Sequence, residues 1–584
     1  MVLLAVVASS AIAAAVLTPI VARLAIRIGV VVTPRADRWH RAATPLLGGL
    51  AMGLPVLVIF AAIAPRSSQT LVIIAAGTAA LALGMLDDLR HLAPSTKLVG
   101  QVAVASLLAF GGIQVEMVTI APVAFLLTIF WVVAMMNAIN LMDNMDGLAG
   151  GITMIAALAL TITAFPEAAP AALLAAATSG AALGFLIHNF PPARIFMGDT
   201  GSQFLGFALA TAALLHTASG ATSLGLAVLG PLAVLALPIF DTALVLVSRG
   251  RAGIPVSRGG TDHVSHRLAA LGLTDRGTAL MLYAIATILA VVGILADATS
   301  TLVLPLFGLA IAGLALFGVF LHEVDVYGWQ ANGAVNGGSG QRILKGFWTY
   351  GRFGTEIGID AVLLTLAYYV AYLIRFEGIP QEGWTGLFAG SVPLIVGSQL
   401  VAMVVFGVYR TLWRYLGISD AILIARSLGL GTAVAALLII FLGPTGYSRA
   451  VFILDALIAI AFLAGSRAFL LWLRQWFSAR PRSGQRRVLI VGANDRGVSA
   501  ARLFASTADG ASYRPIGFLD DDPGKRYRQI AGIPVLGRTD QLRAVIERHR
   551  VDLVVVAGDP GQTSDIGLEC EAAGVEFREF HVRV

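Results

Sequence analysis

The sequence has little charge and almost no cysteine for its length. Of its 584 residues, 13% are charged and 57% are hydrophobic, and the mean hydropathy is +0.83. A soluble protein of this size has too little interior to hide so much apolar side chain, so the composition excludes a wholly soluble chain and indicates a membrane protein. The one cysteine, Cys570, excludes an internal disulfide and a cysteine-based metal site.

Long apolar runs organise most of the chain. A span needs roughly 20 apolar residues, and we count about eleven such runs before Leu321 and about four between Asp360 and Trp476. From Arg480 onward, charges become frequent and short Val/Ile-rich runs alternate with polar stretches. We therefore predict a polytopic α-helical membrane protein with a C-terminal soluble Rossmann-like α/β domain. The predicted parts are a membrane domain, a cytoplasmic linker, a four-helix membrane block and a soluble domain, at residues 1–322, 323–352, 353–476 and 477–584.

Basic residues concentrate on one side of the predicted spans. Arginine is frequent at and after the end of the first span, at Arg23, Arg27, Arg35, Arg38 and Arg41. Because cytoplasmic loops carry the excess of Lys and Arg, this segment is predicted to be cytoplasmic, and such loops explain the net charge of +6 without any binding of nucleic acid. Counting spans onward puts the polar segments on the same face, at residues 87–97, 137–151, 188–202 and 249–276. Ionisable groups at the membrane edge are costly and usually functional, so this face is the candidate active site.

Carboxylates mark two of these segments. Asp87 and Asp88 are adjacent, and two such acids need a cation or a proton nearby, although a helix end that projects acids into water would read the same way. Asn140, Asp143 and Asp146 recur every three residues, so at a helix end they share one face and converge oxygen ligands.

The other two segments combine small residues with an acid, and basic side chains with one another. Asp199 lies between Gly198 and small residues, where a hard cation and phosphates can approach the backbone, although a Gly-Asp turn is also common at helix starts. His263, His266 and Arg267 form a predicted cationic cluster suited to a diphosphate, and an ordinary basic loop is the alternative.

Together and in this order, the segments resemble the polyprenyl-phosphate N-acetylhexosamine-1-phosphate transferase family over residues 1–322. The resemblance extends to His40–Leu50, where residues 44–45 and 48–49 look like the family's first cytoplasmic loop, and to residues 189–194, which lead into the Gly-Asp motif. The segment from His263 to Arg267 is similar to the N-acetylglucosamine-1-phosphate branch.

The resemblance implies an enzyme and a site. The family transfers N-acetylhexosamine-1-phosphate, for this branch GlcNAc-1-phosphate, from a UDP-sugar to polyprenyl phosphate and releases UMP, which initiates cell-envelope glycan synthesis. It implies Mg²⁺ or Mn²⁺ at Asp199 and Asn140, and catalytic roles for Asp87, Asp88 and Asp143. The implied substrate-binding residues are His40, Thr44, Lys97, Asp146, Asn189, Phe196, His263, His266 and Arg267.

Finer roles follow from the same resemblance. Phe196 would stack on uracil, and Asp87 would accept a proton during direct attack by the lipid phosphate, with a covalent aspartyl phosphate as the alternative. Two positions depart from the family pattern: Ser265 stands where relatives often have His, and Asn144 replaces a usual Gly.

The second half resembles the N-terminal part of nucleotide-sugar epimerase/dehydratase polysaccharide proteins. Residues 487–492 read as a strand that runs into a glycine turn, so Gly492, Gly497 and Asp520 are candidate nucleotide-binding residues of an accessory domain. Asn494 occupies the middle glycine position of that pattern. We expect residues 341–584 to serve dimerisation or to sense or present a nucleotide sugar.

Two other classes compete with the transferase. A secondary transporter would place its acids near the membrane midplane and show inverted repeats, whereas these acids lie at span ends. A regulatory or scaffolding membrane protein that senses nucleotide sugars is the alternative function, and it would tolerate a broken metal motif. The expected partners are a UDP-sugar, polyprenyl phosphate, membrane lipid and a second copy of the chain, in a bacterial-type inner membrane with the active site and C-terminal domain in the cytoplasm.

Overall fold

The computed structural model describes all residues except 33–43, 166–168, 220–227, 253–259, 261, 299–302, 323, 325–338, 378–383, 411–417, 443–446, 479–484, 507–512, 527, 558–562 and 581–584. The chain divides into two compact units, Met1–Ala269 with Leu273–Trp472, and Ala270–Gly272 with Leu473–Val584. His40, predicted to bind substrate, lies outside the described residues.

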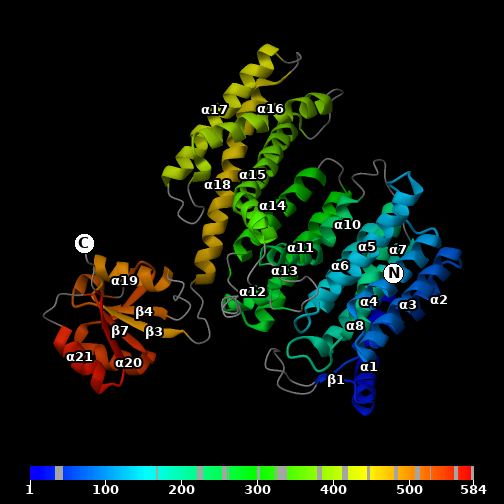
Figure 1. Ribbon diagram of the computed structural model, residues 1–584, viewed down its shortest axis with the longest axis horizontal. Helices are drawn as coiled ribbons and strands as arrows, with labels where there is room; N and C mark the ends of the chain where they lie inside the picture. The colour runs from blue at the N-terminus through cyan, green and yellow to red at the C-terminus, as the bar shows by residue number, and fades with distance from the viewer. Residues whose placement is uncertain are drawn as a thin grey trace. The chain divides into compact units, whose positions relative to one another are not determined.

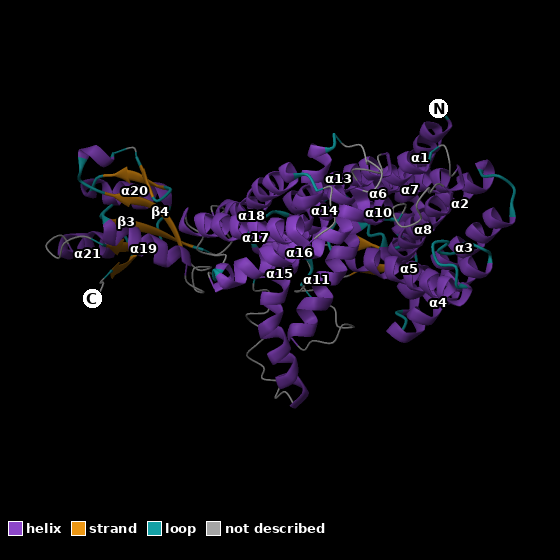
Figure 2. Cartoon of the chain, turned by 90° about the horizontal axis from the view of Figure 1, so that it is seen from above, coloured by secondary structure: helices purple, strands orange, loops and turns teal. Residues whose placement is uncertain are grey.

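The first unit is built almost entirely of helices (Figures 1 and 2). Its transferase-like part contains α1 (Val2–Arg27), α2 (Gly48–Ile63), α3 (Ser68–Arg90), α4 (Pro94–Phe110), α5 (Ala121–Met142), α6 (Leu148–Ala164), α7 (Ala169–Asn189), α8 (Gly198–Ser219), α10 (Leu229–Val234), α11 (Ala236–Ala252), α12 (Val264–Ala270), α13 (Asp275–Ala298) and α14 (Val303–His322). A short antiparallel pair, β1 (Val31–Val32) and β2 (Thr44–Pro45), precedes α2.

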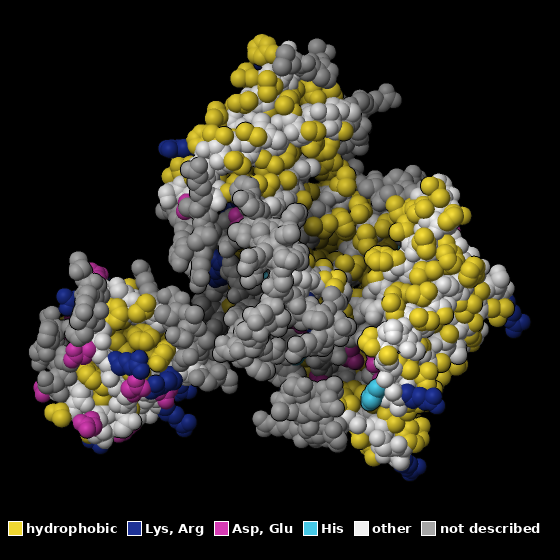
Figure 3. All heavy atoms as spheres, in the orientation of Figure 1, with side chains coloured by type: hydrophobic (Ala, Val, Ile, Leu, Met, Phe, Trp, Pro, Cys, Tyr) yellow, Lys and Arg dark blue, Asp and Glu magenta, His cyan; other side chains and the backbone are white. Residues whose placement is uncertain are grey.

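The membrane class is confirmed. Among the described residues, ten helices are long and apolar enough to cross a membrane, and α2, α4 and α6 are shorter apolar helices. Large apolar side chains remain exposed along these helices, and the face seen in Figure 3 is mostly apolar there. Such a surface is stable in lipid and not in water. The total of about fifteen spans stays a prediction.

Glycines allow the helices around α8 to approach closely. Helix α8 packs against α3, α5 and α2, while α1 packs against α7. A Cβ on Gly84 of α3 would overlap the Asp199 carbonyl, and one on Gly49 of α2 would overlap the Gly201 backbone. Because these residues lack a Cβ, three polar segments meet at the start of α8.

The second membrane block contains α15 (Ser339–Arg375), α16 (Trp384–Val405), α17 (Ile418–Leu442) and α18 (Arg449–Ser478), with the 3-10 turn η1 (Val408–Arg410). Helix α15 begins inside the stretch predicted to be a linker, and residues 323 and 325–338 of that stretch lie outside the described residues. Within the block, Arg467 of α18 binds both carboxylate oxygens of Asp360 of α15, at 2.8 and 2.6 Å. A bidentate pair of this kind satisfies two charges that lipid would otherwise leave without water.

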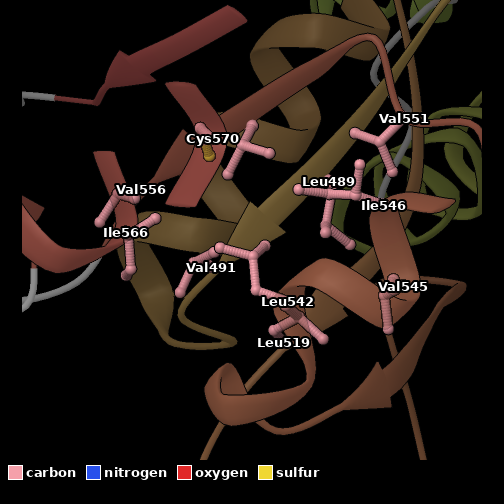
Figure 4. Packing of buried hydrophobic residues seen from close by; sticks show 11 residues of the cluster. Leu489, Val491, Leu519, Leu542, Val545, Ile546, Val551, Val556, Ile566 and Cys570 are labelled. Carbon is pink, nitrogen blue, oxygen red and sulfur yellow. The ribbon is translucent and has the colours of Figure 1, made fainter. Parts of the chain in front are cut away.

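The soluble domain has one sheet of order β5-β6-β4-β3-β7-β8, parallel except for β5 against β6. Its elements are β3 (Arg486–Val491), α19 (Asp495–Ser506), β4 (Tyr513–Leu519), η4 (Pro523–Lys525), β5 (Gln529–Ile530), β6 (Ile533–Gly537), η5 (Thr539–Gln541), α20 (Leu542–His549), β7 (Leu553–Val556), α21 (Thr563–Ala572) and β8 (Glu576–Glu579). Apolar side chains of β3 and β7 pack against α20 and α21 on one face (Figure 4). The predicted α/β class is therefore confirmed.

Candidate active site

Asp88 anchors the first turn of helix α8. Its carboxylate accepts the backbone N–H groups of Asp199 and Thr200 at 2.8 and 2.9 Å, and the Thr200 hydroxyl at 2.5 Å. The first N–H groups of a helix have no partner within the helix, and a negative charge there is favoured by the helix dipole. Asp88, predicted to be catalytic, is thus used to fix the position of Asp199.

Lys97 joins the remaining polar groups of α3, α5 and α8. Its Nζ lies 2.9 Å from Asp87 Oδ2, forms an ion pair with Asp199 Oδ1, and lies 3.5 Å from Asn140 Oδ1. The Asn140 amide also donates to Asp199 and to Ser202 Oγ, the latter at 2.8 Å. Four residues from four helices, predicted separately as catalytic, substrate-binding and metal-binding, therefore lie in one contact network.

Asp143 differs from its neighbours in having a carboxylate with no hydrogen bond or ion pair to the described residues. It lies just after the end of α5. Burial raises its pKa well above the usual range, and the negative charges of Asp199, Asp88 and Asp146 raise it further. Asp143 is half-buried, and a carboxylate without a partner among the described residues is available to a substrate proton or to a cation.

The loop from Asp143 to Gly147, which we name the acidic loop, is held at its other residues. Asp146 accepts the Ala193 N–H at 2.8 Å. The Asn189 side chain accepts the Gly147 N–H at 3.0 Å and donates to the Ile195 carbonyl at 2.8 Å, so it braces two loops. Tyr283 of α13 donates to the Gly147 carbonyl at 2.6 Å. Both the oxygen and the nitrogen of the Asn189 side chain, predicted to bind substrate, therefore form hydrogen bonds within the protein.

Phe196 and Thr44 lie at the edge of the same region. Phe196 is half-buried, its N–H donates to the Pro45 carbonyl, and its carbonyl accepts the Gly48 N–H, each at 2.9 Å. These two bonds fix the position of its backbone. Thr44 is buried and pairs with Val32 in the small sheet.

The predicted cationic cluster is arranged differently from the expectation. Arg267 is 1% exposed, and its guanidinium donates to the carbonyls of Asp262 and Leu321 and to Ser248 Oγ, each at 2.9 Å. Burial, followed by the neighbouring His263, lowers the pKa of His266 to about 4, so its ring is neutral near pH 7. Because Arg267 braces α12 from within, direct phosphate binding by its guanidinium needs a rearrangement of these bonds.

Sequence reasoning missed two sets of buried polar groups. Gln101 donates to Gln203 at 2.9 Å and Asn137 donates to Gln101 at 2.8 Å, beneath the Lys97 network. Gln101 and Gln203 follow Lys97 and Asp199 by one helical turn, and that spacing was a usable signal.

The other missed residue is Asp241 in α11, which lies 2.9 Å from His263 Nδ1 and accepts the Val264 N–H at 2.8 Å. It therefore fixes the start of α12. A single acid in an apolar helix was its sequence signal.

The donor set fits a hard divalent cation held partly by substrate. Oxygens of Asp87, Asp199 and Asn140 all face the Lys97 ammonium, so the position suits a positive charge. No cluster of three or more His, Cys, Asp or Glu side chains able to hold a metal occurs in the described part of the chain. Asp199 and Asn140 can thus supply two oxygen ligands and leave several positions for phosphate oxygens and water, as Mg²⁺ prefers.

The glycine turn of the soluble domain has its polar groups already paired. Asn494 Oδ1 accepts the Gly497 N–H at 2.9 Å. Asp520 accepts the N–H groups of Ala493 and Asp522 at 2.8 and 2.9 Å and binds Lys525 Nζ at 2.9 Å. A ribose could use Asp520 only by replacing some of these internal bonds, and the nucleotide site at Gly492, Gly497 and Asp520 stays a prediction.

Comparison with known proteins bears on both halves. Residues 70–217 match the family described as Glycosyl transferase family 4, and residues 404–557 match a family described as CoA-binding domain. A Bacillus subtilis protein named "Probable undecaprenyl-phosphate N-acetylglucosaminyl 1-phosphate transferase" is 33% identical over 321 residues, covering 53% of this chain and 88% of that protein. The decaprenyl-phosphate N-acetylglucosaminephosphotransferase of Mycolicibacterium smegmatis is 35% identical over 300 residues, covering 44% of this chain and 73% of that protein.

The fold and the site define a polytopic membrane protein whose acids, lysine and asparagine suit the transfer of a phosphate-bearing group. The extent of the similarity makes the family plain. This chain belongs to the polyprenyl-phosphate N-acetylglucosamine-1-phosphate transferases and is a phosphoglycosyltransferase by family. The resemblance read from the sequence is confirmed, and the transferase is supported over the scaffolding alternative.

Proposed function

We propose that this chain transfers N-acetylhexosamine-1-phosphate, with GlcNAc-1-phosphate as the expected group, from a UDP-sugar to polyprenyl phosphate. The products are the polyprenyl-diphosphate sugar and UMP. The observation that carries the proposal is the contact network of Asp87, Lys97, Asn140 and Asp199. Beside it lies Asp143, whose carboxylate has no partner among the residues that the structure describes. That network offers both charge signs to two phosphate-bearing substrates at once.

The reaction balances without further reagents. A phosphate oxygen of the lipid attacks the phosphorus that bears the sugar, a new P–O bond forms, and the P–O bond to UMP breaks with its electron pair left on UMP. If the attacking phosphate carries a proton, Asp143 is the acceptor that the site offers, because Asp87 is paired with Lys97 at 2.9 Å and accepts the Leu92 N–H at 2.7 Å. Asp87, which the resemblance implies as the proton acceptor, would have to release one of these partners to take up that role.

Charge neutralisation is the other requirement, because two anions must meet. Lys97 can bind a phosphate oxygen when it releases Asp199 or Asp87. Mg²⁺ or Mn²⁺ at Asp199 and Asn140 would supply stabilisation of the charge that develops on UMP. Asp88 keeps Asp199 at a fixed place in the first turn of α8.

The UDP-sugar is expected to bind with its uracil at Phe196. The backbone of Phe196 is fixed by bonds to Pro45 and Gly48, which presents the ring as a rigid stacking surface. We expect α12 with the preceding His263, which we name the histidine helix, to contact the donor next to the acidic loop, because Ser265 of α12 donates to Asn144. Arg267 supports that helix through its bonds to the Asp262 and Leu321 carbonyls.

We also propose that the acidic site faces the cytoplasm and that the chain forms a homodimer through residues 341–584. The excess of arginine near the end of α1 supports the orientation. A shared membrane aligns two copies, and closed two-fold symmetry is the commonest arrangement. The edge strand β8 carries Glu576, Arg578 and Glu579, charges that disfavour edge pairing, so the membrane helices are the better candidate surface. The mass of the full-length protein in detergent tests this.

A donor panel tests the function. Purified full-length protein is incubated with polyprenyl phosphate, Mg²⁺ and separately with UDP-GlcNAc, UDP-GalNAc or UDP-MurNAc-pentapeptide, and both UMP and lipid-linked sugar are measured. We expect UMP and lipid product in equal amounts, with UDP-GlcNAc preferred. Glu116→Gln, an exposed acid far from α8 in sequence, is the control variant. Formation of UMP without lipid product, or no turnover with any donor, would refute the proposal.

A further inference from the structure

The acidic loop and the histidine helix are joined by one side-chain hydrogen bond. Ser265 Oγ of α12 donates to Asn144 Oδ1 at 2.5 Å. Ser265 is 1% exposed and Asn144 is half-buried, so water competes little for this bond.

Asn144 is held so that its oxygen must point to Ser265. Its Nδ2 donates to the Leu141 carbonyl at 2.8 Å, at the end of the same helix. With the amide nitrogen committed to α5, the oxygen is a fixed acceptor for α12. The contact therefore sets the distance between two segments that are 121 residues apart in the chain.

The neighbours on each side give this distance a chemical meaning. Asn144 follows Asp143, whose carboxylate has no bond to the described residues, and Ser265 lies between His263 and His266. The other fixed residues of the acidic loop bind elsewhere: Asp146 binds Ala193, and Gly147 binds Asn189 and Tyr283. Asn144 is the residue of the loop whose side chain accepts a hydrogen bond from Ser265 of the histidine helix.

We propose that Asn144 and Ser265 are a positioning pair for the sugar diphosphate. The pair holds the acidic loop and α12 at one separation, so that Asp143 and the histidine helix meet the same donor molecule. Neither residue needs to touch the substrate. The inference rests on the proposed function and adds the residues that set the width of its donor site.

A double-mutant cycle tests the pair in the full-length protein. Ser265→Ala, Asn144→Ala and the double variant are assayed for kcat and for the KM of UDP-GlcNAc. Each single change is expected to lower kcat/KM about tenfold, as seen when a supporting hydrogen bond of a site is removed. The double variant should lose no more than Asn144→Ala alone, because Asn144→Ala already removes the bond that Ser265→Ala deletes, together with the bond to the Leu141 carbonyl.

Two further variants separate positioning from general destabilisation. Ser265→Thr keeps the hydroxyl and should recover most of the activity lost in Ser265→Ala. Thr287→Ala removes a hydroxyl that bonds the Tyr283 carbonyl of its own helix α13, and should leave kcat and KM unchanged.

The outcomes are distinguishable. A wild-type protein without turnover overturns the proposed function itself. An active wild type with unaffected single variants, or with losses that multiply in the double variant, overturns the positioning pair and leaves the function standing. Equal losses in Ser265→Ala and Thr287→Ala would also overturn it.

Discussion

The acidic site of the first unit and the glycine turn of the soluble domain are both polar clusters at the ends of helices and strands. They differ in how far their polar side chains are bonded to other groups of the protein. At the glycine turn, Asn494 and Asp520 bind backbone N–H groups and Lys525. In the acidic site, Asp143 has no partner in the described residues, and Lys97 faces more than one acid. A carboxylate without a hydrogen-bond partner indicates a site for a ligand, whereas polar side chains that are bonded to the backbone indicate a structural turn.

This difference predicts that kcat falls most when a charged or unbonded side chain of the acidic site is replaced. Asp199→Asn should abolish metal-dependent transfer, on the order of 1,000-fold in kcat, because an oxygen ligand and a negative charge are lost where phosphates meet. Asn140→Ala should cost less. UMP release at ordinary and raised Mg²⁺ measures both effects, and full activity of Asp199→Asn at ordinary Mg²⁺ would remove Asp199 from the site.

Asp143→Asn is expected to lower activity without lowering stability. We expect kcat to fall about 100-fold or more, as for a lost proton acceptor. The free energy of unfolding should not fall, because the change removes a buried charge near three other acids. Thermal unfolding in detergent and UMP release are compared with those of Glu116→Gln. A destabilised Asp143→Asn would show that the carboxylate has a structural partner.

Much of the acidic site is readable from sequence, because its logic is local and repetitive. The spacing of Asn140, Asp143 and Asp146 follows from helix geometry, and the apolar runs predict the helices. The sequence does not reveal which partner each of these acids has within the folded protein. Asp87 and Asp88 are adjacent and chemically identical, yet one pairs with Lys97 and the other anchors α8.

The soluble domain likewise has features that the sequence predicts and contacts that it does not. Its strand-turn-helix pattern is visible in the sequence, and so is the replacement of a glycine by Asn494. The bond from the Gly497 N–H to Asn494 is a local contact at the start of α19, whereas the bond from the Ala493 N–H to Asp520 joins residues 27 apart and depends on the folded sheet. Arg267 is a similar case, since sequence identifies a phosphate-binding type of side chain and burial gives it internal partners.

Asp88→Asn tests the structural role assigned to one of the paired acids. The amide can accept one hydrogen bond but presents N–H to the Thr200 donors, so α8 should lose roughly 1–2 kcal/mol of stability, as for a lost helix cap. Activity should fall together with stability, unlike that of Asp143→Asn. Thermal unfolding of the two variants side by side gives the measurement, and an undamaged Asp88→Asn melting curve would contradict the anchoring role.

Asn494→Ala changes the glycine turn of the soluble domain and should have the smallest effect on transferase activity. Removing the side chain leaves the Gly497 N–H without its partner, which should cost about 1 kcal/mol locally. Because the turn is filled by the protein itself, transferase activity should stay within about twofold of the wild type, the range of a surface substitution. Hydrogen exchange at the start of α19 and UMP release in the full-length protein measure the two quantities. A tenfold loss of transfer with little change in exchange would mean that the turn acts on the transferase, and the contrast between a ready site and a structural turn would then fail.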